Sequence, residues 1–176
     1  SGGGVRNCTA TSEGGSAYGG GVQVNAGAAT LTTVEVDGCV ASSRSNQANG
    51  GGVNVGRGGT LEMSGGGVRN CTATSEGGSA YGGGVQVNNG GAATLHAVEV
   101  RGCTASSVLG QPTGGGVEVY GGTLEMIGGS VSECTAVSET NDAWGGGVQV
   151  QGGAATLSAV EVRGCNASSV SGQPNG

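Results

Sequence analysis

Six cysteines recur at a nearly constant spacing, and their thiols are the most reactive side chains in the sequence. They are separated by 31, 32, 32, 31 and 31 residues and lie at Cys8, Cys39, Cys71, Cys103, Cys134 and Cys165. If equivalent residues stack, these cysteines form either a buried column of thiols or three disulfides between neighbouring coils, such as Cys8–Cys39 and Cys71–Cys103. A metal site is not expected, because cysteines a full repeat apart supply single ligands without a CxxC pair or a nearby histidine.

Three Asn-x-Ser/Thr sequons lie beside these cysteines, at Asn7, Asn70 and Asn166. Where a cysteine points into the protein, its neighbour points out, so each asparagine is a candidate for N-glycosylation in a secreted eukaryotic protein.

Tyr18, Tyr81 and Trp144 each precede a glycine triplet and predict a column of rings on the outer surface, about 9.6 Å apart because two coils separate them. Such rings are suited to stacking on the sugars of a polysaccharide. Their alternative role is to shield an exposed glycine corner.

Catalytic chemistry has no clustered residues to support it. Asp37 and Asp142 are isolated, and the glutamates follow the repeat along a solvated strand. A glycosidase or lyase needs carboxylates, or a base with a metal, gathered on one face. We therefore expect neither an enzyme nor a cofactor.

Threonines also follow the repeat and raise an alternative function, an ice-binding face. They precede leucine in every unit, at Thr30, Thr60, Thr94, Thr123 and Thr156. Stacked in one outward column, their hydroxyls would form a regular array, although threonine is also an ordinary outward residue of strands.

The elements that position these side chains follow from the repeat itself. GGGV ends at Val22, Val53, Val85, Val117 and Val148, so each unit of 31 or 32 residues reads GGGVxV, a glycine-rich bend, TL, VxxCxA and a polar loop. This pattern predicts three short strands per unit. Helical repeats of similar length are excluded because each interior glycine costs a helix about 1 kcal/mol relative to alanine.

We therefore predict an all-β, right-handed parallel β-helix of about five and a half coils, with each strand pairing with its copies about 4.8 Å above and below. Residues 1–176 are expected to be one β-solenoid segment of a longer repeat array. Its inward columns would be the valine of GGGV, the leucine of TL, and the valine, cysteine and alanine of VxxCxA.

The composition argues against two classes of partner, nucleic acids and membranes. The net charge of −6 and the absence of lysine argue against nucleic acid. No apolar run approaches the ~20 residues needed to span a bilayer, so direct membrane insertion by this segment is not expected.

The alternation of VxxCxA with GGGV resembles the repeats of chlamydial polymorphic outer membrane proteins and related autotransporter-type surface β-helices, which carry FxxN and GGA followed by an aliphatic residue. The resemblance covers the whole chain and places the six cysteines where the family has an inward asparagine. It implies an extracellular or cell-surface location.

Together these features predict a structural, rod-forming segment of a stalk, adhesin or fibre, such as a surface or flagellar hair. Its partners would be further copies of the repeat or other fibre subunits, and glycans if the rings bind them. The alternative is a carbohydrate-binding or ice-binding repeat surface.

Overall fold

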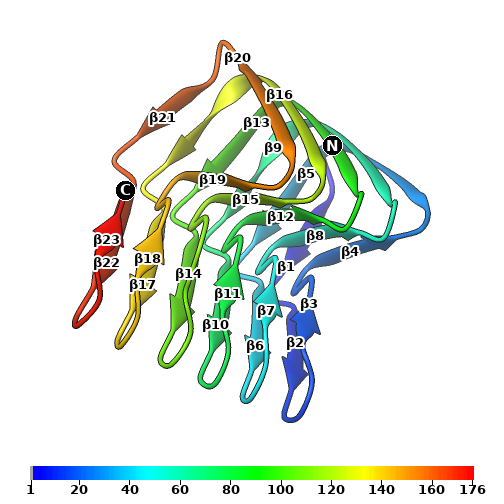
Figure 1. Ribbon diagram of the computed structural model, residues 1–176. Helices are drawn as coiled ribbons and strands as arrows, with labels where there is room; N and C mark the ends of the chain where they lie inside the picture. Colours follow the sequence, from blue (N-terminus) through cyan, green and yellow to red (C-terminus); the bar gives the residue numbers. More distant parts are fainter. Residues whose placement is uncertain (1) are drawn as a thin grey trace.

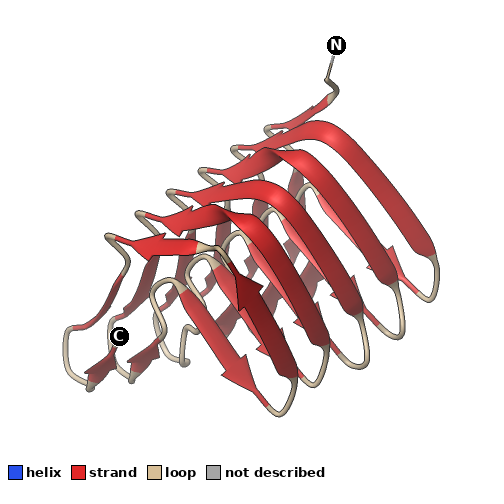
Figure 2. Cartoon of the chain, turned by 90° about the horizontal axis from the view of Figure 1, so that it is seen from above, coloured by secondary structure: helices blue, strands red, loops and turns tan. Residues whose placement is uncertain are grey.

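The computed structural model describes residues 2–176, which form strands and the bends between them. Every pair of strands is parallel and joins neighbouring coils, so the chain winds as a solenoid (Figures 1 and 2). The predicted all-β parallel β-helix is confirmed. Within the described residues no helix is long and apolar enough to cross a membrane.

The strands fall into four groups that run along the solenoid axis. The long-strand sheet contains β1 (Gly4–Arg6), β5 (Ala28–Asp37), β9 (Thr60–Arg69), β13 (Ala92–Arg101), β16 (Thr123–Ser132), β20 (Ala154–Ser158) and β21 (Glu161–Arg163). The floor sheet contains β4 (Val22–Asn25), β8 (Val53–Gly56), β12 (Val85–Asn88), β15 (Val117–Tyr120) and β19 (Val148–Gln151).

The other two groups form a leg that projects from the body (Figure 1). The outer sheet contains β2 (Thr9–Ser12), β6 (Val40–Ser43), β10 (Thr72–Ser75), β14 (Thr104–Ser107), β17 (Thr135–Ser138) and β22 (Asn166–Ser169). The short strands are β3 (Ala17–Tyr18), β7 (Ala48–Asn49), β11 (Ala80–Tyr81), β18 (Ala143–Trp144) and β23 (Pro174–Asn175).

The body is filled by small and medium apolar side chains. Val22, Val53, Val85, Val117 and Val148 are direct strand partners along the floor sheet, so the predicted valine column is confirmed. The long strands bend in mid-course, where residues such as Thr33 and Ala97 have φ near +51°. One long strand therefore covers two sides of the body. Most turns contain four strands rather than the predicted three, because a short strand follows the outer one; the turn of Thr113 lacks it.

The leg is thin because alanines fill it. Ala48, Ala73, Ala80 and Ala105 form a fully buried cluster between the outer sheet and the short strands. The chain turns back into the floor sheet through the glycine triplet. A Cβ on the middle glycine, Gly83, would lie 2.3 Å from the backbone carbon of Thr104, so only glycine allows this close approach.

The predicted single column of Thr-Leu pairs is wrong. Thr30 pairs with Glu62, and Leu31 pairs with Met63, because the Thr-Leu pair moves by two residues along strands of equal length. A shift of two keeps leucine inward, since side chains alternate with a period of two, but it moves leucine to the next column. The five threonines therefore divide between two rows, and the basis for an ice-binding face is lost.

The two inward columns produced by this shift differ in how side-chain volume varies from coil to coil. One column alternates alanine and leucine, as in Ala29, Leu61 and Ala93, and the adjacent one carries Leu31, Met63 and Leu95. Leu61, Met63 and Leu95 are at most 1% exposed. The larger volume of leucine in alternate coils is offset at the bend of the long strand, where Val34 pairs with Gly66 and Val98 with Gly129, so the body stays evenly filled.

Candidate functional site

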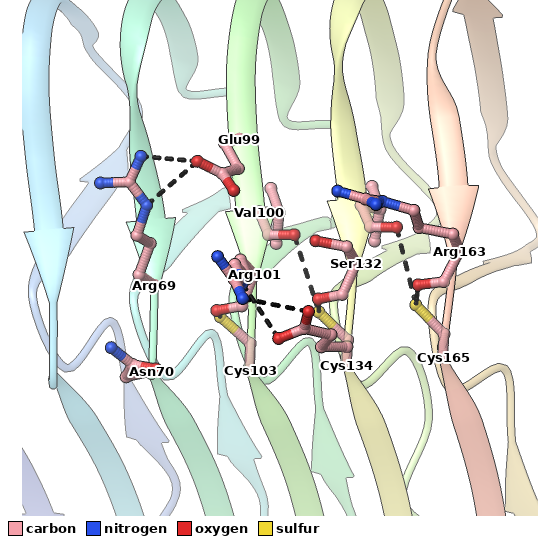
Figure 3. Close-up of polar contacts among 12 residues, drawn as sticks. Arg69, Asn70, Glu99, Val100, Arg101, Cys103, Ser132, Cys134, Arg163 and Cys165 are labelled. Atoms are coloured by element: carbon pink, nitrogen blue, oxygen red, sulfur yellow. Dashed lines mark hydrogen bonds and ion pairs between the residues drawn. The ribbon is translucent and has the colours of Figure 1, made fainter.

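The six cysteines line one inner edge of the body. Each thiol donates to the carbonyl two residues earlier at 3.1–3.5 Å, and from Cys39 onward each also lies 3.5–3.8 Å from a valine carbonyl of the preceding coil. Figure 3 shows the contact of Cys134 with the Val100 carbonyl, with Cys103 and Cys165 in the same row. The thiols of this column therefore donate hydrogen bonds to the backbone carbonyls at each bend.

Burial makes the Cys39 thiol a poor nucleophile. Desolvation raises the pKa of Cys39 to about 11, and the thiolate is the reactive form. A Cβ on Gly21 would lie 2.9 Å from the Cys39 sulfur, so the last glycine of the triplet makes room for the cysteine. All six cysteines are free thiols in the structure. Disulfides Cys8–Cys39 and Cys71–Cys103 stay a prediction.

The sequon asparagines occupy two kinds of position. Asn7 and Asn70 lie at the bend before a cysteine with φ of 53° and 51°, where alternate coils have glycine. This left-handed conformation favours Asn or Gly and by itself accounts for asparagine there. Asn166 follows its cysteine, in β22. All three are exposed, and their glycosylation stays a prediction.

Charged side chains join coils on the outside of the long-strand sheet. Arg69 lies between Glu35 and Glu99 and donates hydrogen bonds to both carboxylates, the second of which Figure 3 shows. These three side chains are 30–36% exposed. Among residues 2–176, no three His, Cys, Asp or Glu side chains gather as metal ligands.

The most varied side chains lie in the concave angle between the leg and the floor sheet, which we call the groove. On the leg, Tyr18, Tyr81 and Trp144 belong to one column, separated by single coils that carry Asn49 and Thr113. Tyr18 and Trp144 are each 37% exposed. The rings therefore recur every second coil, about 9.6 Å apart.

Amides cover the floor of the groove. Outward residues of the floor sheet form the row Gln23, Asn54, Gln86, Glu118 and Gln149. Within it, Asn54 Nδ2 donates to Gln86 Oε1 at 2.7 Å, and Asn88 Nδ2 donates to the same oxygen at 2.7 Å. The amides of successive coils thus satisfy one another.

Glu118 interrupts this amide row. It is 0% exposed, and neither of its carboxyl oxygens has a hydrogen-bond partner among the described residues. Burial raises the pKa of Glu118 from 4.5 to about 7. The Thr113 hydroxyl, in a side chain 6% exposed, is also buried and makes no well-formed hydrogen bond, but it lies beside the Glu118 carboxyl and partly offsets the rise of its pKa.

Comparison of the chain with protein-family models, with curated proteins and with solved structures found no match. The resemblance to chlamydial and autotransporter-type β-helices therefore stays a prediction.

Sequence reasoning identified the rings but missed the groove and Glu118. The signal was present in the letters after the glycine triplet, which read GGGVQV, GGGVNV, GGGVQV, GGGVEV and GGGVQV. One acid in a row of amides becomes notable only when the row is known to be buried. Nothing in the sequence alone indicated that an outward strand position would be covered by the leg.

Proposed function

We propose that this segment is a structural rod within an extracellular or cell-surface protein, as in a stalk, an adhesin or a fibre. The observation that carries the proposal is the register. The outer sheet and the floor sheet each pass from the first coil to the last without a slip, with Ala10, Ala41, Ala73, Ala105, Ala136 and Ala167 stacked in order.

Backbone hydrogen bonds parallel to the axis give such a stack stiffness without special side-chain chemistry. Each coil contacts only its neighbours, so length can change by whole repeats while the cross-section stays constant. Further copies of the repeat or other fibre subunits are the partners that suit this geometry. The loops at the tip of the leg, such as residues 44–47 and 108–111, differ between coils and would carry specific contacts.

A series of proteins with different numbers of repeats tests whether the segment forms a rod. Proteins with one, two and three added copies of the two-coil module 64–126 should lengthen by about 9.6 Å per module at constant diameter, measured by small-angle scattering and electron microscopy. The matched control carries Gly83→Val in each added module, which blocks the close approach to Thr104. A particle that grows equally in all dimensions as modules are added contradicts the proposal.

The extracellular part of the proposal rests on the exposed sequons and needs its own experiment. The intact mass of the protein secreted from eukaryotic cells, before and after glycosidase treatment, should differ by glycans attached at Asn7, Asn70 or Asn166. An unchanged mass, together with unmodified asparagine peptides, counts against this location.

A further inference from the structure

All the aromatic side chains of this protein line one surface. The chain has three tyrosines, one tryptophan and no phenylalanine. Tyr18, Tyr81 and Tyr120 border one hollow of the groove, and Trp144 borders the next. Tyr120 pairs with Gln151, which lines the second hollow, so the two hollows follow each other along the axis. Shielding of the glycine corners would account for Tyr18, Tyr81 and Trp144, but not for Tyr120, which lies in the floor sheet and faces the same hollow.

We propose that the groove binds an extended, uncharged polysaccharide that lies along the solenoid axis. The C–H faces of pyranose rings would stack on Tyr18, Tyr81 and Trp144. Sugar hydroxyls would bond to the exposed amides that line the same hollows, which are Gln47, Asn89 and Gln151. Amides both donate and accept hydrogen bonds, as hydroxyls do. The two-coil step between rings is close to the length of a disaccharide unit in an extended chain.

The charge of the groove selects against other polymers. Arg57 is the only charged residue among the described residues that line its hollows. An acidic polysaccharide or a nucleic acid needs several cations to compensate its charge. A neutral chain needs none, and rings combined with a few placed polar groups are the usual lining of a ligand site.

A second observation places a specific contact near Trp144. Thr113 lines the same hollow as Trp144, Gln149 and Gln151, and its buried hydroxyl lacks a partner. Glu118 lies beneath, beside Gln149 in the floor sheet, with both oxygens unbonded. Buried polar groups in folded proteins are normally paired. The Thr113 hydroxyl lies beside the Glu118 carboxyl, so a sugar hydroxyl that bonds to Thr113 from this hollow would complete a pair of groups whose hydrogen bonds the protein alone leaves unmade.

The single tryptophan makes the test direct. Trp144 fluorescence is titrated with the hexasaccharides of cellulose, chitin, laminarin, xylan and mannan, and with polygalacturonate as the acidic comparison. We expect at least one neutral hexasaccharide to give a saturable change, with its disaccharide about tenfold weaker because it reaches one ring. No saturable change with any neutral hexasaccharide at about 10 mM, or equally tight binding of polygalacturonate, overturns the proposal.

Variants taken from neighbouring coils preserve the fold while removing the rings. Tyr81→Asn copies Asn49, and Trp144→Thr copies Thr113, each from the same column. Each should weaken binding about tenfold by calorimetry, and Thr113→Val, which keeps the shape and removes the hydroxyl, about fivefold. Leu109→Ala, exposed on a leg loop, should bind as the parent does.

Unchanged affinity in both ring variants refutes the proposal, whereas unchanged affinity in Thr113→Val alone refutes the specific contact. The same variants should retain their rod dimensions, so a failure of sugar binding leaves the structural function standing.

Discussion

Glu118→Gln is expected to stabilise the protein at neutral and alkaline pH. Glutamine has nearly the shape of the protonated acid and restores the amide row of the floor sheet, but it cannot ionise. In the folded chain the pKa of Glu118 is about 7, above its ordinary value of 4.5. Between these two values the folded state binds more protons than the unfolded state, so the parent loses stability as the pH rises from about 4.5 to about 7.

The size of the effect follows from the shift. Each pKa unit corresponds to about 1.4 kcal/mol, so a change from 4.5 to about 7 gives a difference of roughly 3 kcal/mol at pH 8. The carboxyl is fully buried, so no correction for solvent screening applies. Below pH 4.5 the acid is protonated in both states, and the variant and the parent should agree within about 0.5 kcal/mol.

Urea unfolding followed by Trp144 fluorescence from pH 4 to pH 8 measures this difference. Glu125→Gln is the matched control, because it makes the same chemical change on the exposed side of β16 in the next part of the same coil. It should shift stability by less than about 0.5 kcal/mol at every pH. A variant–parent difference at Glu118 that is constant with pH, or a variant less stable than the parent at pH 8, refutes the reasoning.

Three further outcomes follow from the packing. Iodoacetamide should label the half-buried Cys8 and Cys165 well before Cys71 and Cys103 in the native protein, as read by peptide mass spectrometry; equal rates would mean that the thiol column is open. Gly83→Ala should cost about 3 kcal/mol or more in urea unfolding, whereas Gly14→Ala, with open space around its Cβ, should be neutral; similar effects would contradict the close approach. Arg69→Ala should cost about 1 kcal/mol, and Arg44→Ala under about 0.5 kcal/mol, because both arginines lie between two carboxylates but Arg44 is 69% exposed and Arg69 only 36%; the reverse order would contradict the role of burial.

The sequence predicted the coils well because the inward positions repeat. Val53, Val85 and Cys71 each stand at a fixed place in a unit of 31 or 32 residues, and pairing each residue with its copy in the next coil stacks them all inside. The Thr-Leu register was not predictable in the same way, because a shift by two preserves the inward direction of leucine. The sequence does not show whether Leu31 pairs with Leu61 or with Met63, and the structure shows that it pairs with Met63.

The groove was beyond sequence reasoning for a different physical reason. It exists because the chain reverses at the tip of the leg and returns through two-residue strands such as Ala80–Tyr81, which are too short to carry a periodic pattern. The reversal covers Asn54, Gln86 and Glu118, although their alternation with valine is typical of solvent-facing residues. Burial of the outward face is therefore a tertiary effect.

In a solenoid, residues that differ from their stacked copies indicate function better than residues that repeat, and Glu118 and Thr113 are two such residues. Any amide at position 118 would continue the row that Asn54 and Gln86 form, and asparagine at position 113 would continue the one that Asn49 begins. A pure rod should therefore tolerate the double change Glu118→Gln and Thr113→Asn, with higher stability above pH 7 and unchanged length. If the groove binds a polysaccharide at these groups, the same double variant should lose affinity while it gains stability, because unpaired buried polar groups are tolerated where a ligand completes them.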